Sequence, residues 1–249
     1  MLYKKIKNIL KENNYNFINL QSTLSTMDEV RDFLIKKNKN CLLLASEQTQ
    51  GRGRRGSLWS SPLGNIYCSM SFSNLVKVKD HFMFSVIICV SIKMALEKYY
   101  VKGIQFKWPN DIFYENKKFS GIISEIYNIN NSKQYIVMGF GINFISSPKV
   151  KNYPTTHIKS FCANIEINDF LLSFLEILFT NYKNFMKGNN IHILNIYTNS
   201  LMYINKNIKI MLPNNSIKSG IFRGINLDGS LRLENKKNIE NIYNGSIRL

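Results

Sequence analysis

Closely spaced cysteine pairs are missing from this chain. Its four cysteines stand far apart in the sequence, and no two of them have C-x-x-C spacing: Cys41, Cys68, Cys89 and Cys162. Three of the four lie in apolar runs. We therefore expect reduced cysteines in a protein core, and neither a disulfide framework nor a zinc site.

A long apolar run is also missing. The longest, around residues 82–90, is too short to span a bilayer. Lysines 4, 5 and 7 have no long apolar segment behind them, as a secretory signal would have. These two absences favour a cytoplasmic enzyme or binding protein with no membrane partner.

Acidic residues are scarce. The 249 residues include 16 Asp and Glu against 33 Lys and Arg, which gives a formal net charge of +17. Such a balance favours anionic partners, such as nucleic acid, nucleotides or an acidic protein. However, the lysines are scattered, and the abundance of Lys, Asn, Ile and Tyr would also follow from drift towards A+T-rich codons. Composition alone leaves both explanations open.

The apolar pattern predicts an α+β fold. Helical spacing predicts helices at 25–37, 81–100, 168–187 and, shorter, 190–200. Short apolar runs predict strands at 16–21, 41–47, 66–73, 104–108, 112–114, 119–127 and 134–145. Strands joined by short turns dominate 104–145, which indicates a mixed, mainly antiparallel sheet with helices packed on one face.

The pattern changes near residue 205. Short strand candidates follow at 209–212, 218–225, 230–233 and 239–243, and Asn-Asn and Asp-Gly turn signals separate the first three. These strands predict a small C-terminal β-barrel. We place the domain boundary here, with a larger domain at 1–205 and the small one at 206–249.

An irregular run at 48–64 stands out between two strand candidates. It holds four glycines and three arginines, at positions 51, 53, 56 and 64 and at positions 52, 54 and 55. Glycine lets the backbone approach a ligand closely, and arginine offers a fork of donors matched to phosphate and carboxylate oxygens. We call residues 48–61 the clamp loop and expect it to hold an anion. The loop alone leaves phosphate, carboxylate and nucleic acid open.

Three further polar islands lie along the chain. They are Ser25-Thr26-Met27, Lys107-Trp108-Pro109-Asn110-Asp111 with Lys118-Phe119-Ser120-Gly121-Ile122 close behind, and Gly139-Phe140-Gly141-Ile142-Asn143. Each has an ordinary explanation on its own. A Ser-Thr pair is usually a helix cap, Gly-x-Gly in a strand often marks a bulge or close packing, and charges beside a turn are normally solvated.

Taken together and in this order, the islands resemble those of biotin–protein ligases, also called holocarboxylase synthetases. The family's G-R-G-R-x-G and W-x-S-P-x-G motifs match residues 51–56 and 59–64. Its K-W-P-N-D, K-x-x-G-I and G-x-G-I-N motifs match 107–111, 118–122 and 139–143. The resemblance extends from about residue 16 to the end of the chain.

The resemblance implies a fold and an activity. The fold is the class II aminoacyl-tRNA synthetase/biotin ligase-like domain with an SH3-like C-terminal barrel. The family makes biotinyl-5′-AMP from biotin and ATP, with Mg²⁺ accompanying the pyrophosphate, and transfers biotin to one lysine of a carrier. The acceptor it implies is the biotin carboxyl carrier protein of acetyl-CoA carboxylase. We expect a monofunctional form, monomeric or homodimeric, without the helix-turn-helix domain that binds operator DNA in some members.

The resemblance also assigns roles to residues. The expected catalytic cations are Arg52, Arg54 and Lys118. The expected biotin site is Ser25, Thr26, Met27, Gln48, Gly51, Arg52, Gly53, Arg54, Trp59, Lys118 and Gly121. The expected adenylate site is Arg54, Lys107, Asn110, Asp111 and Asn143. No protein ligand for the metal is assigned, although Asp111 is a candidate, and no general base for the acceptor lysine is evident.

The chain departs from the family pattern at three positions. Met27 stands where an Asn is common, which removes one side-chain hydrogen bond. Ser57 stands where a basic residue is often found, which removes one phosphate contact. His157 lies near the place where some members stack an aromatic ring on adenine. We expect structural roles for His81 and His192.

Two functions other than biotin ligation were also considered. Lipoate–protein ligases and octanoyl transferases share the fold, but their clamp reads R-R-x-x-G-G-G, whereas this chain has G-R-G-R and K-W-P-N-D. A basic nucleic-acid-binding protein would also explain the positive charge and the Arg-rich loop. The long motifs favour biotin.

Overall fold

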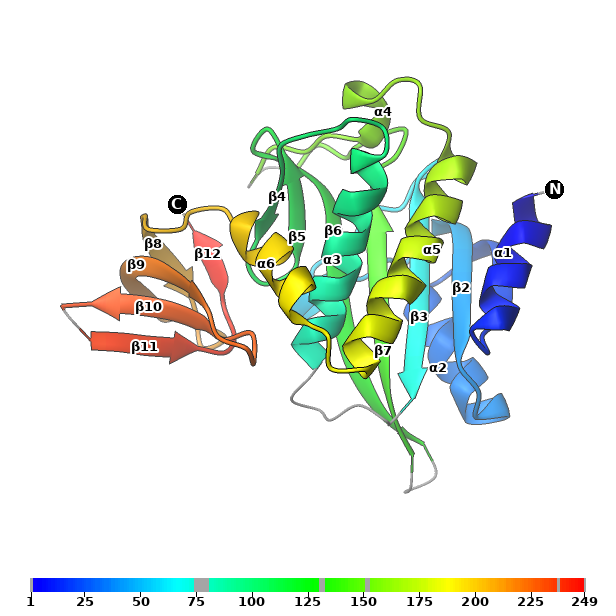
Figure 1. Ribbon diagram of the computed structural model, residues 1–249, viewed down its shortest axis with the longest axis horizontal. Coiled ribbons are helices and arrows are strands. Elements are labelled where there is room, and N and C mark those ends of the chain that lie inside the picture. Colours follow the sequence, from blue (N-terminus) through cyan, green and yellow to red (C-terminus); the bar gives the residue numbers. More distant parts are fainter. Residues whose placement is uncertain (1, 74–80, 130–132, 151–152, 237, 249) are drawn as a thin grey trace.

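The larger of two sheets forms the centre of the molecule (Figure 1). The computed structural model describes residues 2–73, 81–129, 133–150, 153–236 and 238–248. The larger sheet has seven strands in the order β1-β2-β3-β7-β6-β5-β4. They are β1 (Asn16–Thr23), β2 (Cys41–Gln48), β3 (Ile66–Ser73), β4 (Ile104–Lys107), β5 (Asp111–Tyr114), β6 (Lys117–Ile129) and β7 (Lys133–Ile142). Only β1 and β2 run parallel, so the expected mainly antiparallel α+β fold is confirmed.

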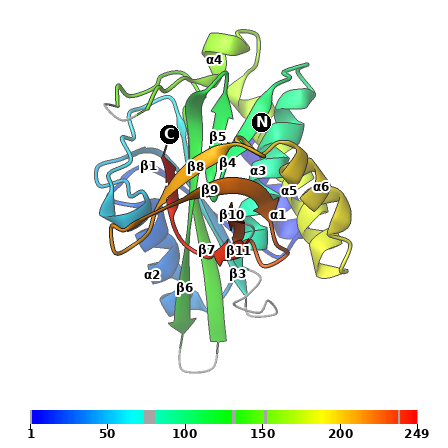
Figure 2. The same ribbon diagram turned by 90° about the vertical axis from the view of Figure 1, so that its left-hand side faces the viewer.

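Helices cover both faces of this sheet, but unequally (Figure 2). On one face lie α1 (Leu2–Glu12), α3 (His81–Glu97), α5 (Ile167–Met186) and α6 (Ile191–Asn199). On the other face lies α2 (Thr26–Lys37), which the sequence analysis had placed with the rest. The short α4 (Ile158–Phe161) follows β7 at one end of the sheet. The helix α3 is buried on almost every side because it packs between the sheet and α5 and α6.

The packing of α2 creates a second, smaller core. Met27, Val30 and Leu34 recur on one stripe of the helix and are buried against the sheet, among residues such as Leu43 and Val137. The helix ends at Asn38, which adopts the left-handed conformation. This core fixes the start of α2 above β6 and β7, where the cavity described below opens.

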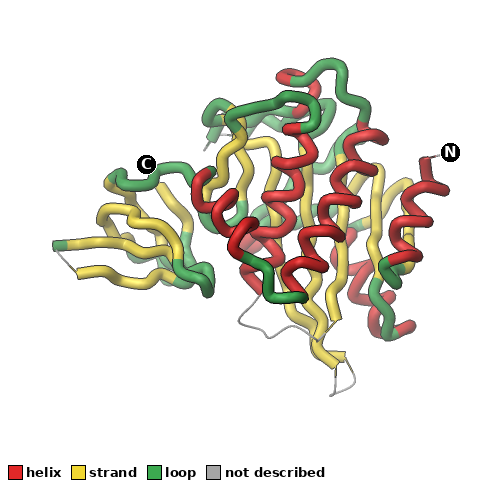
Figure 3. The backbone as a smooth tube through the Cα atoms, in the orientation of Figure 1, coloured by secondary structure: helices red, strands yellow, loops and turns green. Residues whose placement is uncertain are grey.

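A second sheet of five strands forms the C-terminal unit (Figure 3). Its order is β11-β10-β9-β8-β12, and each neighbouring pair is antiparallel. The strands are β8 (Asn207–Met211), β9 (Ile217–Ile225), β10 (Leu231–Asn235), β11 (Asn238–Ile242) and β12 (Ser246–Arg248). The first four match the expected ranges closely. No range was predicted for β12, whose three residues are too few for a periodic pattern.

The two sheets share one continuous hydrophobic core. Ile210 and Phe222 of the C-terminal sheet belong to the same buried cluster as the residues of α3 and β4. The buried Trp108 donates from Nε1 to the backbone oxygen of Gly229 at 2.9 Å, and Phe82 packs against the same glycine. The C-terminal unit is therefore held in one position against the larger domain. Within the described residues, no helix is long and apolar enough to cross a bilayer.

This contact predicts a specific stability defect. Gly229 has φ of +83°, and a Cβ there would lie 2.1 Å from Cγ of Phe82. Gly188 has φ of +80° with nothing within 4 Å, so it is a matched control for backbone strain. We expect Gly188→Ala to lower the free energy of unfolding by about 1 kcal/mol. Gly229→Ala should lower it by roughly 1–3 kcal/mol more.

Urea denaturation of the two variants measures the difference. Equal losses would show that the contact between Phe82 and Gly229 does not hold the C-terminal unit against α3.

Candidate functional site

Two neighbouring cavities, of about 480 Å³ and 600 Å³, collect the residues predicted from the sequence. We call them the first and the second cavity. Among the predicted residues, those that line the first are Ser25, Thr26, Met27, Gln48, Arg52, Gly53, Arg54, Trp59, Lys107, Asn110, Asp111, Lys118 and Gly121. The second is lined by Gly51 and Asn143, together with Gln48, Trp59 and Lys118, which also line the first. Folding thus brings all of the predicted site residues together.

A buried polar network forms one end of the first cavity. The backbone N–H and Oγ1 of Thr26 donate to Oε1 of Gln48 at 2.8 and 2.9 Å. Thr26 Oγ1 also shares a hydrogen bond of 2.7 Å with Ser69 Oγ, and Gln48 Nε2 donates to Ser61 Oγ at 3.0 Å. Ser25 precedes α2 but makes no side-chain capping bond within the described residues, so Gln48 takes that role. The network ties the start of α2 to both ends of the clamp loop.

Glycines on β6 and β7 make the floor of the first cavity. A Cβ on Gly139 would lie 2.7 Å from Sδ of Met27, and one on Gly141 would lie 2.3 Å from Nε1 of Trp59. A Cβ on Gly121 would lie 3.0 Å from Cζ3 of the same tryptophan. The glycines of the K-x-x-G-I and G-x-G-I-N motifs therefore allow two large side chains to lie directly on the sheet.

Trp59 separates the two cavities and lines both. Its Nε1 is buried and has no hydrogen-bond partner among the residues described. The ammonium of Lys118 lies 5.3 Å from the Trp59 ring and 5.2 Å from the Tyr153 ring, within the range of cation–π attraction. The indole ring thus lies next to a fixed positive charge, with its Nε1 against Gly141 of the floor.

Positive charge dominates the other end of the first cavity. Nζ of Lys118 forms an ion pair with Oδ1 of Asp111 at 2.7 Å. Burial lowers the pKa of Lys107, while Asp111 acts in the opposite direction. Asp111 is the one acidic side chain among the described lining residues, which also include Arg52, Arg54, Arg55, Lys107, Lys118 and Arg248. The surplus of cations makes this end a site for anions.

Arg54 connects the clamp loop to the C-terminal sheet. Its Nη1 donates to Asn110 Oδ1 at 3.2 Å and to the backbone oxygen of Gly245 at 3.3 Å, and its Nη2 donates to Asn244 Oδ1 at 2.8 Å. Burial lowers the pKa of Arg54, and Asp111 opposes that shift. The contribution of the turn before β12 was not predicted, because a short Asn-Gly pair outside the motifs carries no signal for this contact.

The rest of the clamp loop forms a tight turn of its own. Gly53 donates its N–H to the backbone oxygen of Ser57 at 2.7 Å, and Ser57 Oγ donates to the backbone oxygen of Arg54 at 2.8 Å. Arg55 and Gly56 adopt positive φ within this turn. Ser57, which replaces a basic residue of the family pattern, therefore stabilises the turn that presents Arg54.

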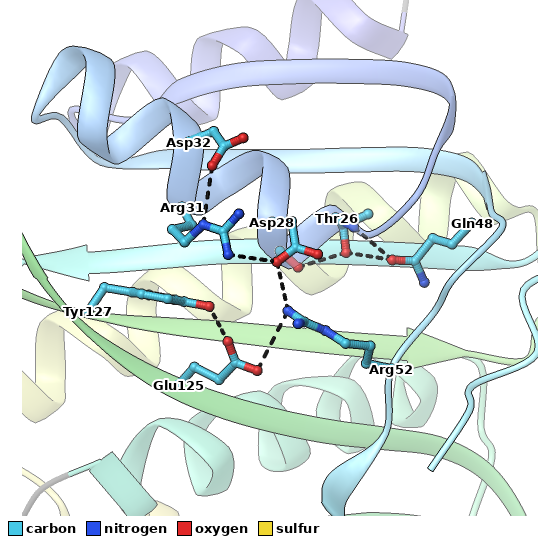
Figure 4. Close-up of polar contacts among 9 residues, drawn as sticks. Thr26, Asp28, Arg31, Asp32, Gln48, Arg52, Glu125 and Tyr127 are labelled. Carbon is cyan, nitrogen blue, oxygen red and sulfur yellow. Dashed lines mark hydrogen bonds and ion pairs between the residues drawn. The ribbon is translucent and has the colours of Figure 1, made fainter. Parts of the chain in front are cut away.

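Arg52 points towards two carboxylates that the sequence analysis missed (Figure 4). Its Nη2 lies 3.0 Å from Oδ1 of Asp28 and 3.6 Å from Oε1 of Glu125. Arg31 shares the same oxygen of Asp28 at 3.2 Å, and Tyr127 donates to Glu125. The network joins α2, the clamp loop and β6. No spacing rule in the sequence connects these three segments.

The two asparagines that the resemblance assigns to the adenylate both bind neighbouring backbone. Asn110 donates from Nδ2 to the backbone oxygen of Ile122, which holds the K-W-P-N-D turn against β6. Asn143 is buried and donates from Nδ2 to the backbone oxygen of Thr156 at 3.1 Å, whereas its Oδ1 has no partner within the described part of the chain. His157 precedes α4 and is not among the described lining residues of either cavity.

Family comparisons match both units of the chain. Residues 17–143 match the Biotin/lipoate A/B protein ligase family, and residues 203–249 match the Biotin protein ligase C terminal domain. The Bifunctional ligase/repressor BirA of Escherichia coli is 27% identical over 92% of this chain and 73% of that protein. The Biotin--[acetyl-CoA-carboxylase] ligase of Paracoccus denitrificans is 30% identical over 43% of this chain and 45% of its own length.

A solved structure supports the fold. The biotin protein ligase of Aquifex aeolicus in complex with biotin and ATP aligns with a TM-score of 0.76 and 23% identity. The alignment covers 94% of this chain and 97% of that one. The two proteins therefore share the arrangement of both sheets.

The glycine floor predicts a coupling between Gly141 and Trp59. We expect Gly141→Ala to lower the free energy of unfolding by roughly 1–3 kcal/mol, because the new methyl group overlaps the indole ring. In a Trp59→Ala background the same substitution should cost much less. A double-mutant cycle by urea denaturation measures this difference. The same loss in both backgrounds would mean that Gly141 is required for another reason.

The charge network predicts how firmly the clamp loop is held. We expect Asp28→Asn and Glu125→Gln each to speed trypsin cleavage after the clamp arginines by about 2- to 5-fold, since each removes one carboxylate from Arg52. Asp32→Asn is the control, because Asp32 pairs with Arg31 and not with Arg52. Cleavage rates that match the control would show that the network does not restrain the loop.

Proposed function

The chain belongs to the biotin/lipoate A/B protein ligase family, and on that basis we propose that it activates biotin with ATP as biotinyl-5′-AMP and transfers biotin to a carrier lysine. The observation that carries this proposal is the first cavity. One end offers a few polar groups beside an apolar floor, and the other end gathers cations around Asp111. A neutral ring system with a carboxylate tail fits both ends at once.

The end of the first cavity that holds the Thr26–Gln48 network and the glycine floor suits the biotin ring. Thr26 and Gln48 form a fixed polar corner that can pair with a neutral ureido group, and Ser25 lies buried beside them. Met27 and Trp59 lie on the glycine floor and provide apolar surface for the bicyclic ring. Because Met27 replaces an Asn, ring recognition in this chain depends on the Thr26–Gln48 corner.

The cationic end suits the reaction. A biotin carboxylate oxygen attacks the α-phosphorus of ATP, the new C–O–P linkage forms, and the bond to the pyrophosphate breaks. Both reactants are anionic, so cations must offset their repulsion and hold them in line. Arg54, Lys107 and Lys118 are held in place by hydrogen bonds, burial or the ion pair to Asp111. Arg52 would join them after leaving Asp28 and Glu125.

The second cavity suits the nucleoside. Asn143, whose Oδ1 is unpaired, lines this cavity, and the Trp59 ring offers apolar surface at its boundary. Lys118 lines both cavities, so a phosphate beside it would connect a nucleoside in the second cavity to a carboxylate in the first.

Magnesium is expected to enter with the nucleotide. Among the described residues, no group of three or more His, Cys, Asp or Glu side chains could hold a metal ion. Asp111 is already paired with Lys118. The donor set does not fit a resident metal, and Mg²⁺ would bind as part of the ATP complex.

The transfer step needs an acceptor lysine. Its amine attacks the activated carbonyl, AMP leaves, and the ammonium proton passes to solvent. The described lining residues hold no histidine and one acid, Asp111, so position and charge are the contributions we expect from the enzyme. The name of the Paracoccus denitrificans relative supports acetyl-CoA carboxylase as the source of the acceptor. We propose its biotin carboxyl carrier protein as the acceptor and the cytoplasm as the location. We propose the domain boundary at residues 205/206, close to the start of the C-terminal match at residue 203.

The effect of the cations on catalysis can be measured separately from their effect on folding. We expect Arg54→Ala and Lys118→Ala each to lower biotin-dependent pyrophosphate release by about 100-fold or more, because each removes a charge that offsets the repulsion between substrates. Thermal unfolding should change far less. Lys117→Ala is the matched control, since Lys117 is exposed and is not among the described lining residues. Near-normal release in the Lys118 variant would remove that residue from the site.

The choice between biotin and lipoate can be tested by binding. Biotin with ATP should raise the unfolding temperature, whereas lipoate with ATP should not. Stabilisation by lipoate alone would contradict the proposal. Incubation with biotin, ATP, Mg²⁺ and a carrier domain should then add one biotin to one lysine, as read by mass.

A further inference from the structure

Asn65, which follows the W-x-S-P-x-G motif, makes an unusual set of hydrogen bonds. Its Oδ1 accepts from the backbone N–H groups of Phe144, Ile145 and Ser146 at 2.8, 2.9 and 3.2 Å. Its Nδ2 donates to the backbone oxygen of Ser146 at 3.1 Å. The side chain is 5% exposed. One asparagine thus organises the whole segment that follows β7.

Three successive N–H groups that converge on one point normally form a site for an anion. Here an amide oxygen from a distant part of the sequence fills it. Phe144 is fully buried, so removing the oxygen would leave its buried N–H without a partner. The segment after β7 therefore depends on Asn65 for its shape.

Further contacts fasten the same region. Gly64 has φ of +92°, and a Cβ there would lie 3.1 Å from Cδ1 of Ile145. The hydroxyl of Tyr67 donates to the backbone oxygen of Pro62 at 2.7 Å. Gly64, directly before Asn65, thus packs against the segment that Asn65 binds.

The two segments that Asn65 joins are walls of the second cavity. Ser60, Ser61 and Pro62 of the first segment line it, and so do Asn143 and Pro148 of the second. Asn65 is not among the described lining residues of this cavity, so it acts on the cavity through the walls.

Asn143 lies next to the bound segment. Its N–H donates to the backbone oxygen of Phe119 at 2.7 Å, and its own backbone oxygen accepts from Ile158 at 3.0 Å. The next peptide N–H is the first of the three that Asn65 accepts. Asn65 thus fixes the peptide that follows Asn143, while the bond from Asn143 Nδ2 to the backbone oxygen of Thr156 holds the side chain itself.

We propose that Asn65 is a positioning residue for the nucleotide: it sets the spacing of the walls of the second cavity and the position of the peptide that follows Asn143. The inference rests on the proposed function only for placing the nucleoside in this cavity. The polar corner of Thr26 and Gln48 makes no hydrogen bond with Asn65 among the described residues, although Gln48 also lines the second cavity and binds Ser61. Loss of Asn65 should affect ATP far more than biotin.

The test compares Asn65→Ala and Asn65→Asp with Asn181→Ala in biotin-dependent ATP–pyrophosphate exchange. Asn181 is a buried asparagine on α5 that binds Ser91 Oγ, so its variant reports general destabilisation. We expect Asn65→Ala to raise KM for ATP about 10-fold, with KM for biotin within about 2-fold. Asn65→Asp retains the acceptor and should stay within about 3-fold of the wild type for both substrates. ATP affinity from thermal shift with ATP alone should follow the same order.

Equal rises in both KM values, or the same pattern in Asn181→Ala, would overturn the inference. So would a poor ATP affinity in Asn65→Asp equal to that of Asn65→Ala. If Asn65→Ala does not fold, Asn65→Ser, with a shorter oxygen acceptor, replaces it in the same comparison. Absence of exchange in the wild type would count against the proposed function, and the ATP thermal shifts would still decide the role of Asn65.

Discussion

Concentration of positive charge in a partly buried space is the constraint on which this site depends. Arg54, Lys107 and Lys118 line one cavity with a single carboxylate, Asp111, among the described lining residues. Like charges at this density repel one another, and burial lowers the pKa of Arg54 and of Lys107. Such a cluster persists only where the surrounding structure holds each cation in place. Here the holders come from the turn before β5, from β5 itself and from the turn before β12.

This constraint explains why the small C-terminal unit packs so closely on the larger domain. Its turn at Asn244 and Gly245 supplies two of the three acceptors of Arg54. The shared hydrophobic core and the bond between Trp108 and Gly229 keep that turn at a fixed distance from the clamp loop. The C-terminal unit is thus part of the cationic site and not an appendage to it.

The sequence predicted the members of the site better than it predicted their partners. Motif residues such as Gln48, Lys118 and Asn143 all reach the cavities, because glycine-rich and polar islands at strand ends meet along one side of the sheet. Asp28 and Glu125, which hold Arg52, were missed. They occupy ordinary helix and strand positions, and only the packing of α2 on the second face brings them together.

The helices and strands also differed in how well the sequence predicted them. Long periodic segments such as α3 and α5 were predicted to within a few residues, since burial of a whole helix leaves a clear apolar signal. The three residues of β12 were too few to show one. Asn65 was also missed, because its side-chain bonds join segments about 80 residues apart and no local pattern marks an acceptor of three backbone N–H groups.

The shared wall of Trp59 and Lys118 has a thermodynamic consequence. A side chain that lines two cavities has one position at a time, so a ligand that changes its position in one cavity changes the free energy of binding in the other. Such coupling is reciprocal: whatever factor the first ligand contributes to the affinity of the second, the second contributes to the affinity of the first. The glycines beneath Trp59 set how far the ring can move, and therefore set the size of that shared factor.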